Sequence, residues 1–190
     1  MNFKPEDAMM NANETRNTGL RSLNELRDYR VSEGDPDVRG WTVRGSRGVD
    51  IGIVRDLLVD VGARRARYLD VDLFGVGDDA DSPSGRHVLV PIGAAKLDDD
   101  SDIVRLPHAT ATNIRNLPNY QRMRFDRGYE MSILGGLNSM AGLGASGIAA
   151  TAAAEDFYGN SYFDESAFYG ARRQLGISDS GRDGHSDTRG

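Results

Sequence analysis

The stretch that decides the fold is DPDVRGWTVRGSRGVDIGIVRDLLVDVGARRARYLDVDL (35–73), followed by RHVLVPIGAAKLDDDSDIVRLPHATATNIRNLP (86–118). Both parts contain short runs of β-favouring residues, and turn residues such as GSRG at 45–48 separate the runs. No helical pattern stands between the runs to serve as the crossover of a parallel sheet. The sequence therefore predicts a mainly β fold, a small antiparallel β-barrel with short flanking helices and extended N- and C-terminal arms.

Two of the runs indicate how their strands are buried. In ARYLDVDLF (66–74), aliphatic residues alternate with Asp70 and Asp72, which predicts one buried face and one face with the acids in water. In RHVLVPI (86–92), apolar residues occupy both alternating positions. We therefore expect this strand to be covered on both sides or to close the barrel, and Pro91 to end it or place it at an edge.

The composition of the flanking segments divides the chain into four parts. Residues 1–34 are predicted to be a polar arm followed by a short amphipathic helix or extended lead-in, and residues 35–120 form the barrel domain. Thr112 is expected to cap a short closing helix. Residues 121–175 are rich first in arginine, then in uncharged and aromatic residues, and are interpreted as a docking extension. Residues 176–190 are predicted to be a disordered tail.

Composition narrows the classes of function. The net charge of −6 argues against a general nucleic-acid binder, because phosphate neutralisation needs a dense field of Lys and Arg. Without cysteine, neither disulfides nor thiolate metal sites can form. The first 17 residues contain no apolar run of the kind a secretory signal needs, so we expect a cytoplasmic protein.

The uncharged stretch 131–154 is long enough to cross a bilayer, which takes about 20 apolar residues, but its glycines and polar residues make insertion marginal. The alternatives are a segment that lies along a membrane or in a partner's groove, and a Gly/Ala loop. Residues 142–147 also match GxGxxG, and Asp164 and Glu165 follow at the distance of a dinucleotide fingerprint. The preceding residues make a poor strand, which argues against that interpretation.

No catalytic or metal-binding residues are assigned. His87, His108 and His185 have no partners at ligand spacing, and we interpret His87 and His185 as surface histidines. No serine lies in a nucleophile motif, and no acid–base pair stands out among the acidic residues. The sequence therefore favours a protein that is not an enzyme and binds no cofactor directly.

The stretches 35–73 and 86–118 resemble the PRC-barrel family, whose fold is that of the cytoplasmic domain of the photosynthetic reaction-centre H subunit. The order of strands and turns is preserved over nearly half of the chain. The family also includes stand-alone soluble proteins, some of them linked to stress or RNA processing. The segment EGDPDVRGW (33–41) is similar to those proteins as well.

A second resemblance concerns the region after the barrel. RGYEMSILGGLNSMA (127–141) is similar to the Gly-Gly-Leu stretch near the C-terminal end of the H subunit, with Gly135, Gly136 and Leu137 at the matching positions. A basic patch of four arginines lies beside this stretch in the sequence. The docking surface that we expect from the patch and the Gly-Gly-Leu match comprises Arg115, Arg122, Arg124, Arg127, Gly135, Gly136 and Leu137.

Asp60 matches an acid of the family's strand-end pattern, where surface carboxylates help to deliver protons toward the secondary quinone. With Asp70 and Asp72, it forms the proton-entry surface that the resemblance implies. The chain departs from the pattern at Gly62 and Ala63, where the H subunit places another acid.

The resemblance implies a cytoplasmic, H-like subunit of a bacterial photosynthetic reaction centre. The expected partners are the membrane subunits, which carry bacteriochlorophyll and quinone, a separate transmembrane H-like chain and an anionic lipid surface. DNA and RNA are not expected partners in this role, and the location is peripheral, on the cytoplasmic face of the inner membrane. The alternatives are a soluble PRC-barrel adaptor that binds protein or RNA, and an enzyme that uses the Gly-rich loop.

Overall fold

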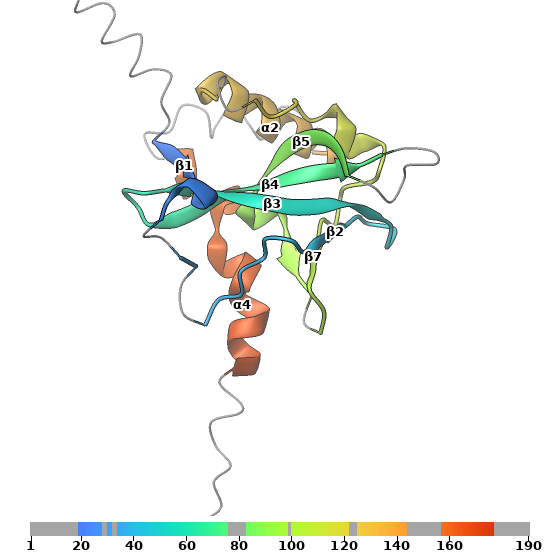
Figure 1. Cartoon of the computed structure of the whole chain (residues 1–190). Helices are drawn as coiled ribbons and strands as arrows, with labels where there is room; N and C mark the ends of the chain where they lie inside the picture. Colours follow the sequence, from blue (N-terminus) through green and yellow to red (C-terminus); the bar gives the residue numbers. More distant parts are fainter. Residues whose placement is uncertain are drawn as a thin grey trace, which may run out of the picture.

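The computed structural model describes residues 19–27, 30–31, 34–75, 83–98, 100–121, 125–143 and 157–176. Its seven strands form one strongly bent sheet (Figure 1). They are β1 (Leu20–Ser22), β2 (Thr42–Arg44), β3 (Asp50–Asp60), β4 (Arg65–Phe74), β5 (Pro83–Pro91), β6 (Lys96–Leu97) and β7 (Ile103–Arg105). The hydrogen-bonded order is β5-β4-β3-β2-β7-β6, and β1 also pairs with β3. The predicted mainly β fold is confirmed.

Two details of the sheet differ from the prediction. Strands β2 and β7 run parallel, because the chain returns from β5 through the β6–β7 hairpin and reaches β2 in the same direction. The hydrogen-bonded ladders do not close the barrel within the described residues, since β5 and β6 stand at opposite ends of the strand order. The predicted turn at 45–48 is present, with Gly48 at a φ of +73°.

The central strands are buried on both faces. Leu69 and Leu73 of β4 belong to the larger core, which also contains Phe168 and Tyr169 of the C-terminal helix. Tyr68 belongs to a second core on the opposite face. The other buried members of the second core are Leu58, Leu89, Ile133, Leu134, Phe157 and Phe163.

The prediction for β5 is confirmed, because Val88, Leu89 and Val90 are all completely buried and Pro91 ends this edge strand. The prediction that the acids of β4 lie in water is wrong. Asp70 and Asp72 are each 5% exposed, because the C-terminal half of the chain covers this face of the sheet as well.

Helix α2 (Arg127–Met140) forms part of this cover (Figure 1). Asp126 caps its N-terminus by accepting a hydrogen bond from the Tyr129 backbone N–H at 2.8 Å. At its C-terminus, Gly142 adopts a φ of +70°. The backbone N–H groups of Gly142 and Leu143 bond back to the carbonyls of Ser139 and Asn138, which is a Schellman motif.

Helix α2 changes the interpretation of the uncharged stretch. Residues 131–140 are helical and pack on the sheet, while residues 144–156 lie outside the described part. No described helix is long and apolar enough to span a bilayer. Gly142 ends a helix instead of following a strand, so the described part of the GxGxxG match lacks the context of a dinucleotide site.

The remaining elements are short helices and α4. They are the 3-10 helices η1 (Leu23–Glu25), η3 (Ile92–Ala94), η4 (Asn113–Asn116), η6 (Phe157–Gly159) and η7 (Ser161–Phe163), and α4 (Glu165–Gly176). In the described part of residues 1–34 the lead-in is a strand and one 3-10 turn, which corresponds to the extended alternative and not to the amphipathic helix. Thr112 makes no side-chain cap among the described residues; instead, Thr110 Oγ1 accepts from the Asn113 N–H at 3.1 Å. The predicted N-terminal arm (1–18) and the tail beyond Gly176 lie outside the described residues.

Aromatic residues of the predicted docking extension fill this protein's own cores. Phe157, Phe163, Phe168 and Tyr169 are all 5% exposed or less. The sequence pattern showed that these side chains need a surface to cover, and that surface is the sheet itself.

Gly93 fixes the docking of η7, because a Cβ atom at this position would lie 2.2 Å from the Ser161 carbonyl oxygen. We expect Gly93→Ala to lower the free energy of unfolding by about 1–3 kcal/mol, since backbone atoms cannot rotate away from the added methyl group. Urea unfolding measures the loss. The control is Gly170→Ala in α4, where an added Cβ meets no described atom within 4 Å and helix propensity predicts a gain of up to about 1 kcal/mol. Equal effects of the two substitutions would contradict the close approach.

Candidate functional site

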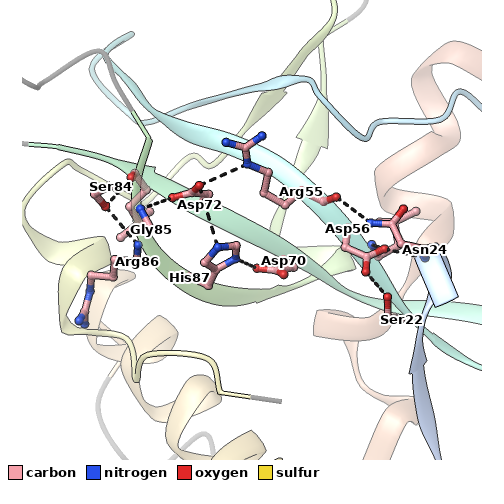
Figure 2. A network of polar contacts seen from close by, with 12 residues as sticks. Ser22, Asn24, Arg55, Asp56, Asp70, Asp72, Ser84, Gly85, Arg86 and His87 are labelled. Atoms are coloured by element: carbon pink, nitrogen blue, oxygen red, sulfur yellow. Dashed lines mark hydrogen bonds and ion pairs between the residues drawn. The ribbon is translucent and has the colours of Figure 1, made fainter. Parts of the chain in front are cut away.

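A row of polar side chains crosses β3, β4 and β5 on the face that the second core covers (Figure 2). Asp70 and Asp72 share this face with Tyr68, because alternate residues of a strand point the same way. His87 of β5 stands opposite Asp72 in the ladder. Its Nδ1 lies 2.7 Å from Asp70 Oδ1, and its Nε2 lies 4.0 Å from Asp72 Oδ2. One half-buried imidazole therefore links two buried carboxylates.

Asp72 is held from two further directions. Its Oδ1 accepts a hydrogen bond from the Gly85 N–H at 3.0 Å, and its Oδ2 accepts one from Arg55 Nε at 3.3 Å. The Asp72 side chain is 7% exposed, whereas that of Arg55 is 46% exposed. Arg55 thus supplies a positive charge from the solvent edge of the row.

Asp56 continues the row toward the N-terminal lead-in. It accepts hydrogen bonds from the Ser22 hydroxyl and from the backbone N–H groups of Asn24, at 3.2 Å, and Leu57, at 2.8 Å. The Asn24 side chain also donates to the Arg55 carbonyl at 3.2 Å. These bonds attach β1 and η1 to β3 and satisfy a carboxylate that is 2% exposed.

The chemistry of the row is that of proton exchange and charge balance. Asp70, His87 and Asp72 adjoin one another, and each of these side chains has a group that can hold a proton. Among the described residues, no group of three or more His, Cys, Asp or Glu is arranged to hold a metal ion. The arrangement can therefore hold or pass a proton along the covered face of the sheet.

The three predicted proton-entry residues do not lie together. Asp70 and Asp72 belong to the row, but Asp60 lies at the β3–β4 turn, in register with Arg65. Asp60 Oδ1 accepts from the Ala63 N–H at 3.0 Å, and Asp60 Oδ2 accepts from Arg67 Nη2 at 3.3 Å. Asp60 thus shapes the turn at the opposite end of β4.

The predicted docking arginines do not form a single patch in the described part of the chain. Arg115 Nη2 donates to the carbonyls of Phe74 and Gly75, the latter at 3.0 Å, and so attaches η4 to the end of β4. Arg127 is stacked on Phe157, with its guanidinium carbon 3.8 Å from the ring centroid. Arg122 and Arg124 lie outside the described residues.

The predicted Gly-Gly-Leu positions, Gly135, Gly136 and Leu137, lie within α2. A Cβ atom on Gly136 would lie 2.6 Å from Leu117 Cδ2, so this glycine lets the helix approach the segment after η4. Leu137 is partly buried against both cores. In this structure these residues make intramolecular contacts, and their role in docking stays a prediction.

Sequence reasoning missed Glu130, which is completely buried beneath α2. Its Oε1 accepts hydrogen bonds from the hydroxyls of Tyr158, at 2.6 Å, and Tyr68, at 3.0 Å. Arg127 Nη1 lies 3.0 Å from Oε2 but not in hydrogen-bonding geometry. Burial raises the pKa of the Glu130 carboxyl, although the Tyr158 hydroxyl, Arg127 and the Tyr68 hydroxyl favour its charged form.

The sequence pattern could have indicated that Glu130 and His87 lie on covered faces of their helix and strand. Glu130 stands three, four and seven residues before Ile133, Leu134 and Leu137, so it occupies the apolar face of the helix. His87 shares the strand face of Leu89, and that strand was expected to be covered on both sides.

Asp72 and Arg55 should differ in their contribution to stability. Asp72→Ala leaves the Gly85 N–H without its partner and removes a nearly buried carboxylate, so we expect a loss of about 2–3 kcal/mol. Arg55→Ala should cost less than about 1 kcal/mol, because its side chain is half exposed and solvent screens the ion pair. Chemical unfolding of both variants and of Asp72→Asn, which keeps an acceptor for Gly85, measures the difference. Equal losses for Asp72→Ala and Arg55→Ala would refute this account.

Glu130 should make stability depend on pH. Because the folded pKa is raised, its contribution is fully present below the unfolded value, near 4.5, and is lost as pH rises through the folded pKa. We expect the wild type to lose stability relative to Glu130→Gln over that interval, as measured by urea unfolding at a series of pH values. Tyr158→Phe removes a bond that favours the charged form, so it should extend the loss to higher pH. A difference independent of pH would rule out this linkage.

The comparison with known families agrees with the architecture. Residues 31–110 match the model of the PRC-barrel domain. The match includes β2 to β7 and the whole Asp70–His87–Asp72 row, and it ends before η4, α2 and the C-terminal elements that cover the row. The chain therefore contains a PRC-barrel domain at residues 31–110.

Proposed function

We propose that this chain is a non-catalytic, H-like subunit on the cytoplasmic face of a bacterial photosynthetic reaction centre. In this role it caps the quinone side of the membrane subunits, supports their assembly and stability, and shapes proton access during light-driven electron transfer. The observation that carries the proposal is the Asp70–His87–Asp72 row, in which titratable groups adjoin one another on a covered face of a rigid sheet.

The proposed partners are the membrane subunits, a separate transmembrane H-like chain and an anionic lipid surface. Bacteriochlorophyll and quinone belong to the membrane subunits, and a separate transmembrane H-like chain provides the anchor. In this role Arg122, Arg124 and Arg127 interact with anionic headgroups, where each basic residue close to the surface contributes about 1 kcal/mol. Arg127 is 46% exposed, so part of its guanidinium remains accessible.

The second candidate is a soluble PRC-barrel adaptor that binds protein or RNA. One observation favours it: Phe157 and Phe163, which belong to the predicted docking extension, are 5% and 2% exposed and complete the protein's own second core. Because these side chains are already buried within the protein, no partner is needed to cover them.

Affinity purification from gently solubilised membranes of the native host distinguishes the two roles. We expect the tagged chain to co-purify with membrane subunits, and the eluate to show the near-infrared absorbance of bacteriochlorophyll. A chain that remains in the supernatant and brings down no pigment would refute the reaction-centre role. RNA or a defined protein partner in that supernatant would support the adaptor.

The His87→Gln variant tests the proton-access part of the proposal. His87 is half-buried beside Asp70, so its substitution should leave docking intact and slow the proton uptake that accompanies full reduction of the secondary quinone after light flashes. Arg55→Gln, at the exposed edge of the row, is the matched control and should have a smaller effect. Unchanged proton uptake in His87→Gln would refute the proton-access part of the proposal and leave only the capping role.

A further inference from the structure

A hollow of about 400 Å³ opens where the start of β4 meets the η6–η7 segment. Arg65 and Arg67 line it from β4, and Tyr158, Ser161 and Asp164 line it from the C-terminal segment. Its volume lies within the range of small-ligand sites. Since the family match ends at residue 110, one wall belongs to the PRC-barrel domain and the other to the segment that follows it.

Arg67 is a buried cation in this wall. Its side chain is 9% exposed, and its guanidinium carbon lies 4.5 Å from the centroid of the Tyr158 ring. Its ion pair with Asp60 is long, at 3.3 Å, and Asp60 is itself 24% exposed. The Nε of Arg67 is buried without a hydrogen-bond partner in the described part of the chain. A buried charge is costly unless it is well paired, so the protein only partly compensates this guanidinium.

Arg65 brings a second positive charge to the hollow. Its side chain is exposed and forms no hydrogen bond or ion pair within 4.0 Å of a described residue, although its charge also acts on the carboxylates of Asp164 and Glu165. The pKa of Asp164, the carboxylate that lines the hollow, is lowered by hydrogen bonds from Ser166 and also by the charge of Arg65. Its Oδ1 accepts from the Ser166 N–H at 2.9 Å and from the Ser166 hydroxyl at 2.6 Å.

We propose that this hollow binds a phosphomonoester through the guanidinium groups of Arg65 and Arg67. Planar guanidinium groups match phosphate oxygens with paired hydrogen bonds, and they keep their charge at any physiological pH. An anion here would complete the charge balance around Arg67. A phosphate group alone is much smaller than the hollow, so there is room for the organic part of the ligand beside Tyr158 and the exposed Ser161.

The test is calorimetric titration of the purified full chain with inorganic phosphate and with glycerol 3-phosphate. Arg65→Gln should weaken binding by about tenfold or more, the usual effect of losing a charge-assisted hydrogen bond. The matched control is Arg64→Gln, which removes the same charge from the neighbouring residue of the β3–β4 turn. Arg64 does not line the hollow, so its substitution should change the affinity by less than about twofold.

A second measurement locates the ligand. The Nε–H signal of Arg67 in a ¹⁵N NMR spectrum should shift as glycerol 3-phosphate saturates the protein, and it should not shift in Arg65→Gln at the same concentration. Binding that leaves this signal unmoved would place the ligand elsewhere and overturn the proposal. Equal weakening by Arg64→Gln and Arg65→Gln would do the same, because it would indicate general charge attraction.

Vesicles distinguish a soluble phosphomonoester from a lipid headgroup. The chain is sedimented with phosphatidylcholine vesicles that contain phosphatidic acid, and with vesicles of phosphatidylcholine alone. Arg65-dependent binding only to the former would identify a lipid as the source, whereas binding of glycerol 3-phosphate in solution would identify a small molecule. Absence of binding to phosphate, glycerol 3-phosphate and vesicles would overturn the proposal. These assays contain no reaction centre, so their outcome is independent of the proposed H-like role.

Discussion

Strand β4 has an aliphatic face and a face that carries Tyr68, Asp70 and Asp72, and neither face is in water. The aliphatic face packs in the barrel core, because apolar side chains on a sheet must be buried away from water. The polar face can be covered only if each acid finds partners, because an unpaired buried carboxylate costs several kcal/mol. His87, Arg55 and the Gly85 N–H meet part of that requirement, and the second core then closes over the row.

This two-sided burial makes the C-terminal half part of the fold. Without α2 and η6–η7, the apolar part of the β4–β5 face, Tyr68 and Leu89, would lose the residues that cover it. The hydroxyls of Tyr68 and Tyr158 both donate to Glu130, so one buried carboxylate joins β4, α2 and η6. The PRC-barrel domain at 31–110 supplies strands β2 to β7 of the sheet, and the segment after it covers the second face.

The sequence alone was sufficient to predict those strands that a pattern of neighbouring residues identifies. Alternation and turn residues located β3, β4 and β5, and the apolar residues in both positions of β5 correctly predicted its burial on both faces. That prediction already implied cover over the neighbouring face of β4, yet alternation alone assigned Asp70 to water. The parallel β2–β7 pair was not predictable, because three-residue strands carry no signal of their partner or direction. The proximity of Asp70 to His87 depended on ladder register, which the sequence does not state.

The buried charged side chains of this protein differ in how many hydrogen bonds and ion pairs the chain gives them. This difference distinguishes side chains that stabilise the fold from a side chain that could bind a ligand. Asp72 has a backbone donor and an arginine, and Asp56 has three donors, so folding alone satisfies both. Arg67 lies at the opposite end of β4 with one ion pair, and its buried Nε has no hydrogen-bond partner among the described residues, beside a hollow that the C-terminal segment completes. A side chain that served only to stabilise the fold would gain from a closer partner or from replacement by an apolar residue of similar volume. The incomplete pairing of Arg67 is therefore better explained by a ligand than by the fold.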